Sequence, residues 1–141
     1  MIGAGVEPRS LLLVGFSASF AAKLADTFGS EIGKRWGRRP VLITTLRSVP
    51  PGTEGAISLA GTLASAAGSV LMTLVMWQLQ LLPSISVSLV VMLIGLLATL
   101  AESLIGALAQ DRFRWLSNEL VNALQTLLAA VMAMLWLGGR I

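Results

Sequence analysis

The chain has 141 residues, of which 55% are hydrophobic and 12% are charged. A soluble domain of this size would carry about 25% charged residues, so this chain cannot cover itself with an ordinary solvated surface. It has no cysteine and no histidine, which excludes disulfides, thiolate chemistry and sites built on imidazole. The net charge of +3 is small and spread along an apolar chain, so no nucleic acid is expected as a partner.

Four apolar segments are expected to cross the lipid bilayer as helices. They cover residues 11–33, 55–82, 84–110 and 117–139. A helix needs about 20 predominantly apolar residues to cross the hydrocarbon layer. The second segment has no charged residue and the third has only Glu102, whereas the first carries Lys23, Asp26 and Glu31. The sequence therefore predicts an all-α, polytopic membrane protein with a single transmembrane domain over residues 1–141.

Basic residues gather in two of the loops between these segments. The loops carry Lys34, Arg35, Arg38, Arg39 and Arg47 after the first segment, and Arg112 and Arg114 after the third. The opposite side carries only Arg9 and Arg140. Because cytoplasmic loops are enriched in Lys and Arg, we expect loops 34–47 and 111–114 to be cytoplasmic, in a plasma or thylakoid membrane. The alternative is a chance asymmetry among few charges.

Polar side chains from three segments are expected in one layer near the basic face. A helical rise of 1.5 Å per residue places Asp26, Glu102 and Asn122 about 8–12 Å below that surface, with Glu31 closer to it. Ionisable residues at such depth are candidates for function. Small residues one turn away on the same faces, such as Ala22 before Asp26, indicate helix packing and not lipid contact.

The carboxylates Asp26, Glu31 and Glu102 are candidate catalytic residues and candidate magnesium ligands. Several carboxylates without histidine or cysteine suit a hard cation such as Mg²⁺. The alternative for Asp26 is a structural ion pair with Lys23, three residues earlier on the helix. That alternative does not account for Glu102, which has no basic residue within its own helical turn.

A Pro-Gly loop ahead of the second segment is a candidate phosphate-binding loop. It contains Gly52, Thr53 and Gly55 and follows Arg47. Glycines let the backbone approach a ligand, a helix N-terminus favours anions, and arginine can bind phosphate with two N–H groups. The alternative is a simple turn. Phosphoryl transfer needs a cation site and a loop that binds phosphate. The acidic layer would supply the first and this loop the second.

Four stretches carry motifs in a characteristic order. They read ADTFGSEIGK over residues 25–34, RPVLITTLRSVPPGTEGAISLAGTLA over 39–64, ESLIGALAQD over 102–111 and WLSNELVN over 115–122. Together they resemble the phytyl-phosphate kinases of plants and cyanobacteria, integral membrane enzymes related in type to CTP-using lipid kinases. The resemblance implies phosphate transfer from a nucleoside triphosphate, expected to be CTP, to phytyl or another prenyl monophosphate. The diphosphate product would feed tocopherol and phylloquinone synthesis.

The same resemblance implies a set of site residues. The metal-binding and catalytic positions fall on Asp26, Glu31 and Glu102, and the phosphate- or nucleotide-binding positions on Lys23, Ser30, Arg47, Gly52, Thr53, Gly55, Gln110, Asn118 and Asn122. Members of that family have further helices ahead of this region. We therefore expect this chain to be the C-terminal part of a longer fold, with the missing helices, a second copy or another subunit covering its polar face. Alternatives are an inactive or partner-dependent fragment of such an enzyme, or a small transporter subunit.

Overall fold

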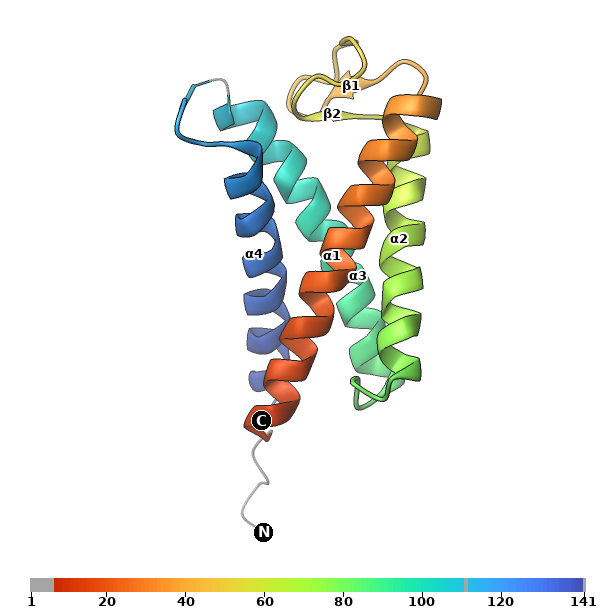
Figure 1. The fold of residues 1–141 in the computed structure, drawn as a ribbon, viewed down its shortest axis with the longest axis vertical. Coiled ribbons are helices and arrows are strands. Elements are labelled where there is room, and N and C mark those ends of the chain that lie inside the picture. The colour runs from red at the N-terminus through yellow and green to blue at the C-terminus, as the bar shows by residue number, and fades with distance from the viewer. Residues whose placement is uncertain (1–6, 111, 141) are drawn as a thin grey trace.

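The structure is a computed structural model that describes residues 7–110 and 112–140, and it is an elongated bundle of helices (Figure 1). In this part of the chain the helices are α1 (Pro8–Trp36), α2 (Leu59–Gln78), α3 (Ile85–Ile105) and α4 (Asn118–Gly138). A π-helical turn, η1 (Gly106–Gln110), extends α3. All four α-helices are long and apolar enough to cross a membrane. The predicted helical, polytopic membrane class is therefore confirmed.

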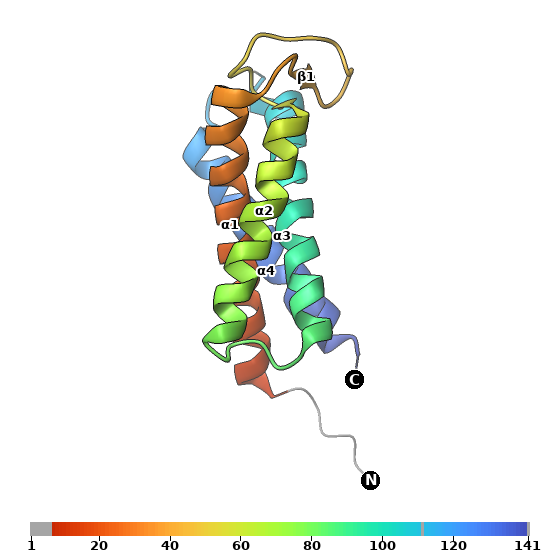
Figure 2. The same cartoon turned by 90° about the vertical axis from the view of Figure 1, so that its right-hand side faces the viewer.

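Helix α1 crosses the face of the bundle that Figure 1 presents and packs against the other three helices. Figure 2 shows the same bundle from the side. Its inward face is made of small residues that are fully buried: Ala18, Ala21, Ala22 and Ala25. Small side chains allow membrane helices to approach closely. The packing face predicted for the first segment is therefore present, and it continues into the buried side chain of Asp26.

The contact between α1 and α2 is formed by glycines. A Cβ atom at Gly68 would lie 2.7 Å from the carbonyl oxygen of Leu24, and one at Gly61 would lie 3.1 Å from that of Gly29. Neither position leaves room for a larger side chain. The two backbones touch here.

The second helix begins later than expected because a short hairpin precedes it. Its strands β1 (Val41–Leu42) and β2 (Ala56–Ile57) pair antiparallel. Gly55 has a φ of 78°, a left-handed conformation that cannot begin a right-handed helix. Ser58 then caps α2 by accepting a hydrogen bond from the N–H of Gly61 at 3.1 Å. Over the residues that the structure describes, the fold is thus all-α except for this hairpin, which the sequence pattern did not predict.

The two ends of the bundle differ in charge. The hairpin and the loop before α4 lie at one end, whereas α1 begins and α4 ends at the other (Figure 1). The two basic loops thus share one end, as predicted, although Asp111 lies outside the described residues. Large apolar side chains such as Leu12, Leu63 and Leu127 are at least 60% exposed along the bundle's length, as is expected of a surface facing lipid. Which compartment the basic end faces remains a prediction.

Candidate functional site

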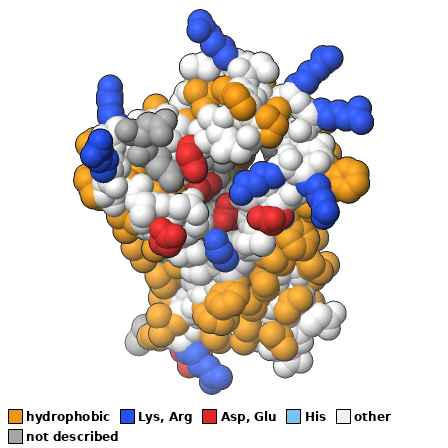
Figure 3. Space-filling model, turned by 45° about the horizontal axis from the view of Figure 1, so that its top comes forward, with side chains coloured by type: hydrophobic (Ala, Val, Ile, Leu, Met, Phe, Trp, Pro, Cys, Tyr) orange, Lys and Arg blue, Asp and Glu red, His pale blue; other side chains and the backbone are white. Residues whose placement is uncertain are grey.

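A cleft of about 350 Å³ opens at the hairpin end of the bundle. Figure 3 shows acidic side chains gathered around a hollow at this end, with Lys and Arg side chains around it. Of the predicted site residues, the cleft is lined by Lys23, Asp26, Ser30, Glu31, Gly52, Thr53, Gly55, Glu102, Asn118 and Asn122. The fold therefore brings together residues from α1, α3, α4 and the hairpin loop, which are far apart in the sequence.

Two predicted residues stand apart from this group. Arg47 is exposed in the loop between the strands and does not line the cleft. Its carbonyl oxygen accepts a hydrogen bond from the N–H of Leu42 at 2.9 Å, so its backbone fixes the turn. The phosphate-binding role predicted for Arg47 is not supported by this position. Gln110 ends the π-helical turn, and its side chain lies outside the described part of the chain.

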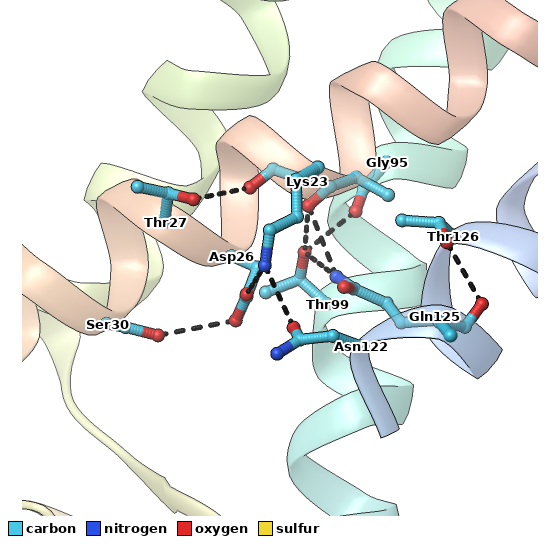
Figure 4. A network of polar contacts seen from close by, with 11 residues as sticks. Lys23, Asp26, Thr27, Ser30, Gly95, Thr99, Asn122, Gln125 and Thr126 are labelled. Carbon is cyan, nitrogen blue, oxygen red and sulfur yellow. Dashed lines mark hydrogen bonds and ion pairs between the residues drawn. The ribbon is translucent and has the colours of Figure 1, made fainter. Parts of the chain in front are cut away.

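Lys23 lies at the centre of the polar contacts in the cleft (Figure 4). Its ammonium Nζ donates to Asp26 Oδ2 at 3.1 Å and to Asn122 Oδ1 at 3.0 Å. Ser30 Oγ donates to the other carboxylate oxygen of Asp26 at 3.3 Å. The ion pair considered as an alternative is therefore formed. It is compatible with a functional role, because the Lys23 side chain remains 48% exposed and lines the cleft.

A buried hydrogen-bond network ties three helices together beneath these groups. Gln125, which is fully buried, donates to the carbonyl oxygen of Ala22 at 3.2 Å and to Thr99 Oγ1 at 3.1 Å. Thr99 Oγ1 also donates to the carbonyl oxygen of Gly95 at 3.0 Å. The network links α4 to α1 and α3, so it fixes the spacing of the helices that carry Asp26 and Glu102. Thr99 was missed in the sequence analysis, although it lies three residues before Glu102 on the same helix face.

The end of the loop between the two strands, from Gly52 to Gly55, forms the roof of the cleft. At Gly55, a Cβ atom would lie 2.7 Å from Ala107 Cα in the π-helical turn. The carbonyl oxygen of Gly55 accepts a hydrogen bond from Ile43 N–H at 3.0 Å. The roof is therefore pressed against the end of α3. It also brings Glu54, another residue missed from sequence, into the cleft wall.

The acidic side chains of the cleft offer carboxylate oxygens as possible metal ligands. Within residues 7–110 and 112–140 no group of three or more acidic residues is arranged to hold a metal ion by itself. Asp26 is buried and Glu102 half-buried, whereas Glu31 is exposed. Mg²⁺ in nucleotide sites usually uses one or two carboxylates and completes its shell with water and phosphate oxygens. The donors present fit that kind of site, and the three-carboxylate arrangement stays a prediction.

Comparison with known proteins gives consistent matches over most of the chain. The family model described as integral membrane protein DUF92 matches residues 3–130. The chain is 44% identical to an uncharacterized membrane protein of Synechocystis, over 94% of this chain and 51% of that protein. It is 43% identical to protein VTE6, chloroplastic, of Arabidopsis thaliana, over 93% of this chain and 40% of that protein. An uncharacterized membrane protein of Methanocaldococcus jannaschii is 39% identical over 87% of this chain and 50% of that protein.

These relatives are longer than the chain described here. The chain spans about half of their length or less, between 40% and 51%. No solved structure matches the chain.

Proposed function

Because the chain belongs to the family of integral membrane proteins DUF92, we propose that it carries the phosphoryl-transfer site of a membrane-bound prenyl-phosphate kinase. The observation that carries the proposal is the cleft, which places the carboxylates Asp26 and Glu102 beside the cation of Lys23 and a glycine loop. The similarity to protein VTE6 supports it, as do the sequence motifs that resemble phytyl-phosphate kinases. We propose phytyl or a related prenyl monophosphate as acceptor, a nucleoside triphosphate such as CTP as donor, and a role in tocopherol synthesis.

The proposed reaction suits a site without histidine. A phosphate oxygen of the lipid attacks the γ-phosphorus of the nucleotide, the bond from that phosphorus to the β–γ bridging oxygen breaks, and the nucleoside diphosphate leaves. The attacking group is a phosphate monoester, which is already largely dianionic near neutral pH. It needs no general base to remove a proton. Catalysis then rests on positioning and on stabilising negative charge, which carboxylate-held cations, lysine and backbone N–H groups can supply.

The residues of the cleft divide between these tasks. Asp26 and Glu102 would hold a nucleotide-bound Mg²⁺, which when bound offsets the charge of the β- and γ-phosphates. Lys23 and Asn122, joined by a hydrogen bond, would bind phosphate oxygens on the α4 side. The backbone of the loop from Gly52 to Gly55 would approach the nucleotide from above. These two carboxylates are tolerated within the membrane because they face this cleft and not lipid.

The basic end of the bundle is proposed to face the cytoplasm or its plastid equivalent, where nucleotides are found. The support is the gathering of basic residues in loops 34–47 and 111–114. Since the chain has no cysteine, the variant Arg114→Cys provides a single site for a membrane-impermeant maleimide. In sealed vesicles whose cytoplasmic face is inside, the introduced cysteine should react with the maleimide only after the vesicles are opened. Labelling of sealed, right-side-out vesicles would reverse the orientation.

A direct assay tests the proposed reaction. The chain in detergent or proteoliposomes, with Mg²⁺, γ-labelled CTP and phytyl monophosphate, should give labelled phytyl diphosphate. The matched variants are Asp26→Asn, expected to be inactive, and Glu119→Gln, an exposed carboxylate outside the cleft, expected to be active. Product formed only after adding the remainder of a relative would identify a partner-dependent part. Ion flux without any product would instead favour the transporter alternative.

A further inference from the structure

A second hollow lies on the flank of the bundle, between α1 and α4. It measures about 460 Å³ and is lined by Ser19, Phe20, Lys23, Thr126, Leu127 and Ala130. Lys23 lines both this groove and the polar cleft, so the two spaces meet at its side chain. Figure 4 shows the ammonium group of Lys23 on α1 beside the side chain of Asn122 on α4, with Thr126 further along α4. We propose that this groove, the tail groove, holds the isoprenoid chain of the lipid monophosphate while Lys23 binds its phosphate; this inference rests on the proposed function.

The floor of the tail groove is formed by small residues that bring the two helices together. Ser19 Oγ donates to the carbonyl oxygen of Thr126 at 3.1 Å, which fixes α1 against α4. One turn away the helices stay close, because a Cβ atom at Gly15 would lie 2.9 Å from Met134 Cγ and 3.4 Å from the carbonyl oxygen of Ala130. Between Ser19 and Ala130 the groove itself is lined by small side chains, which leave room for a slender aliphatic chain.

The walls of the tail groove are large apolar side chains. Phe20 on α1 is 45% exposed and Leu127 on α4 is 60% exposed. The ring of Phe16 packs against that of Phe20, with centroids 4.6 Å apart and planes tilted by 40°, and extends the apolar surface of α1 next to the groove. An isoprenoid chain between these walls would bury apolar surface on both sides while staying continuous with the bilayer.

The positive charge of Lys23 at the upper end of the tail groove favours lipids whose head group is a phosphate monoester. Lys23 bonds to Asp26 Oδ2 and Asn122 Oδ1, and an ammonium group has a third N–H donor. A phosphate monoester brings close to two negative charges. Its tail can enter sideways from the bilayer, and its phosphate then stops where groove and cleft meet. That geometry delivers the acceptor phosphate to the same cleft that holds Glu102.

Filling the tail groove should selectively weaken binding of the lipid substrate. Ala130→Phe blocks the groove, and Ala67→Phe adds the same bulk on the exposed side of α2. We expect Ala130→Phe to raise the KM for phytyl monophosphate about tenfold or more, because the added ring displaces several CH₂ groups of the tail from the apolar groove. The KM for a five-carbon prenyl monophosphate and for CTP should stay unchanged. Ala67→Phe should behave as the unsubstituted protein, and an equal loss with both variants would overturn the inference.

A second pair of variants guards against a folding failure of Ala130→Phe. Phe20→Ala and Leu127→Ala shorten exposed walls, so the bundle should remain folded. Both should raise the KM for phytyl monophosphate and leave that for the five-carbon substrate unaltered. If neither changes the KM for phytyl monophosphate, the tail lies elsewhere.

A binding experiment separates the tail groove from the enzymatic proposal. A long-chain alkyl monophosphate with a diazirine at its tail is photolysed with the protein, without nucleotide, and labelled residues are mapped. Labelling should fall on the walls at Phe20 and Leu127 and be prevented by phytyl monophosphate but not by phytol. Equal labelling of other lipid-facing residues, such as Leu63 and Leu93, would overturn the inference. Specific labelling without any turnover, also after the remainder of a relative is added, would instead retain the groove and reject the kinase.

Discussion

Helix α1 meets its neighbours α2 and α4 in two different ways. Against α2 it is sealed below the cleft by a glycine: Gly68 touches the backbone at Leu24, so no space remains at that level. Against α4 it is held by side chains, through the Ser19 hydrogen bond and the Lys23–Asn122 contact, and a groove stays open beside them. Backbone contact makes a rigid wall, whereas side-chain contact leaves space that a ligand can use. The sealed side would therefore carry stability and the open side chemistry.

The largest expected effect lies on the open side. Asp26→Asn keeps the size of the side chain but removes the charge that pairs with Lys23 at 3.1 Å and that would hold a cation. Turnover should fall about 100-fold or more, as for other losses of transition-state charge stabilisation, while the melting temperature in detergent changes little. Rates are measured against Glu119→Gln, the exposed carboxylate control. Activity within a few-fold of the unsubstituted protein would place the site elsewhere.

Substitution at the sealed contact between α1 and α2 should lower the stability of the protein. Gly68→Ala would place a Cβ atom 2.7 Å from the Leu24 carbonyl oxygen, so the two backbones would have to separate. We expect a loss of about 1–3 kcal/mol in unfolding free energy, typical of overpacking, read as a lower melting temperature. Gly138→Ala is the matched control, because its Cβ atom would meet only Leu11 at 3.9 Å. Equal stability of both variants would show that α1 and α2 are not sealed.

A third pair of variants tests whether the roof depends on contact with α3. Gly52 and Gly55 both have positive φ angles, 86° and 78°, so alanine costs about 1–2 kcal/mol of backbone strain at either position. Only Gly55 also presses on Ala107, whereas a Cβ atom at Gly52 would meet nothing within 4 Å. Gly55→Ala should therefore raise the KM for nucleotide several-fold more than Gly52→Ala does. A similar change in the nucleotide KM of both variants would mean that the effect comes from backbone strain alone and not from contact with α3.

Much of the fold could be predicted from the sequence because the membrane simplifies it. Long uncharged runs have few alternatives to a spanning helix, so the four helices and the shared end of the basic loops were expected. The hairpin was missed because Ala56 and Ile57 look like the start of an apolar helix. Their strand conformation depends on pairing with Val41 and Leu42, a tertiary contact that no local pattern reveals.

The candidate site was predictable in its depth but not in its detail. Helical rise placed Asp26, Glu102 and Asn122 in one layer, and all three line one cleft. Glu54 and Thr99 were missed because loop folding and helix rotation, which sequence spacing does not fix, bring them into the wall. Arg47 was assigned to phosphate from its place beside the loop, although the hairpin keeps it outside the cleft.

The smallest effect is expected at Arg47. Its side chain is exposed and outside the cleft, whereas Lys34 lines the cleft rim. Exposed charges more than about 8 Å from a ligand are largely screened at physiological salt. Arg47→Ala should therefore leave the KM for nucleotide and lipid within about twofold, and Lys34→Ala should raise the nucleotide KM by more. Both variants are compared at low and physiological ionic strength, because a long-range charge effect shrinks with salt. If Arg47→Ala instead raises the nucleotide KM more than Lys34→Ala does, and salt does not reduce the effect, the hairpin must close over the nucleotide and bring Arg47 into the cleft.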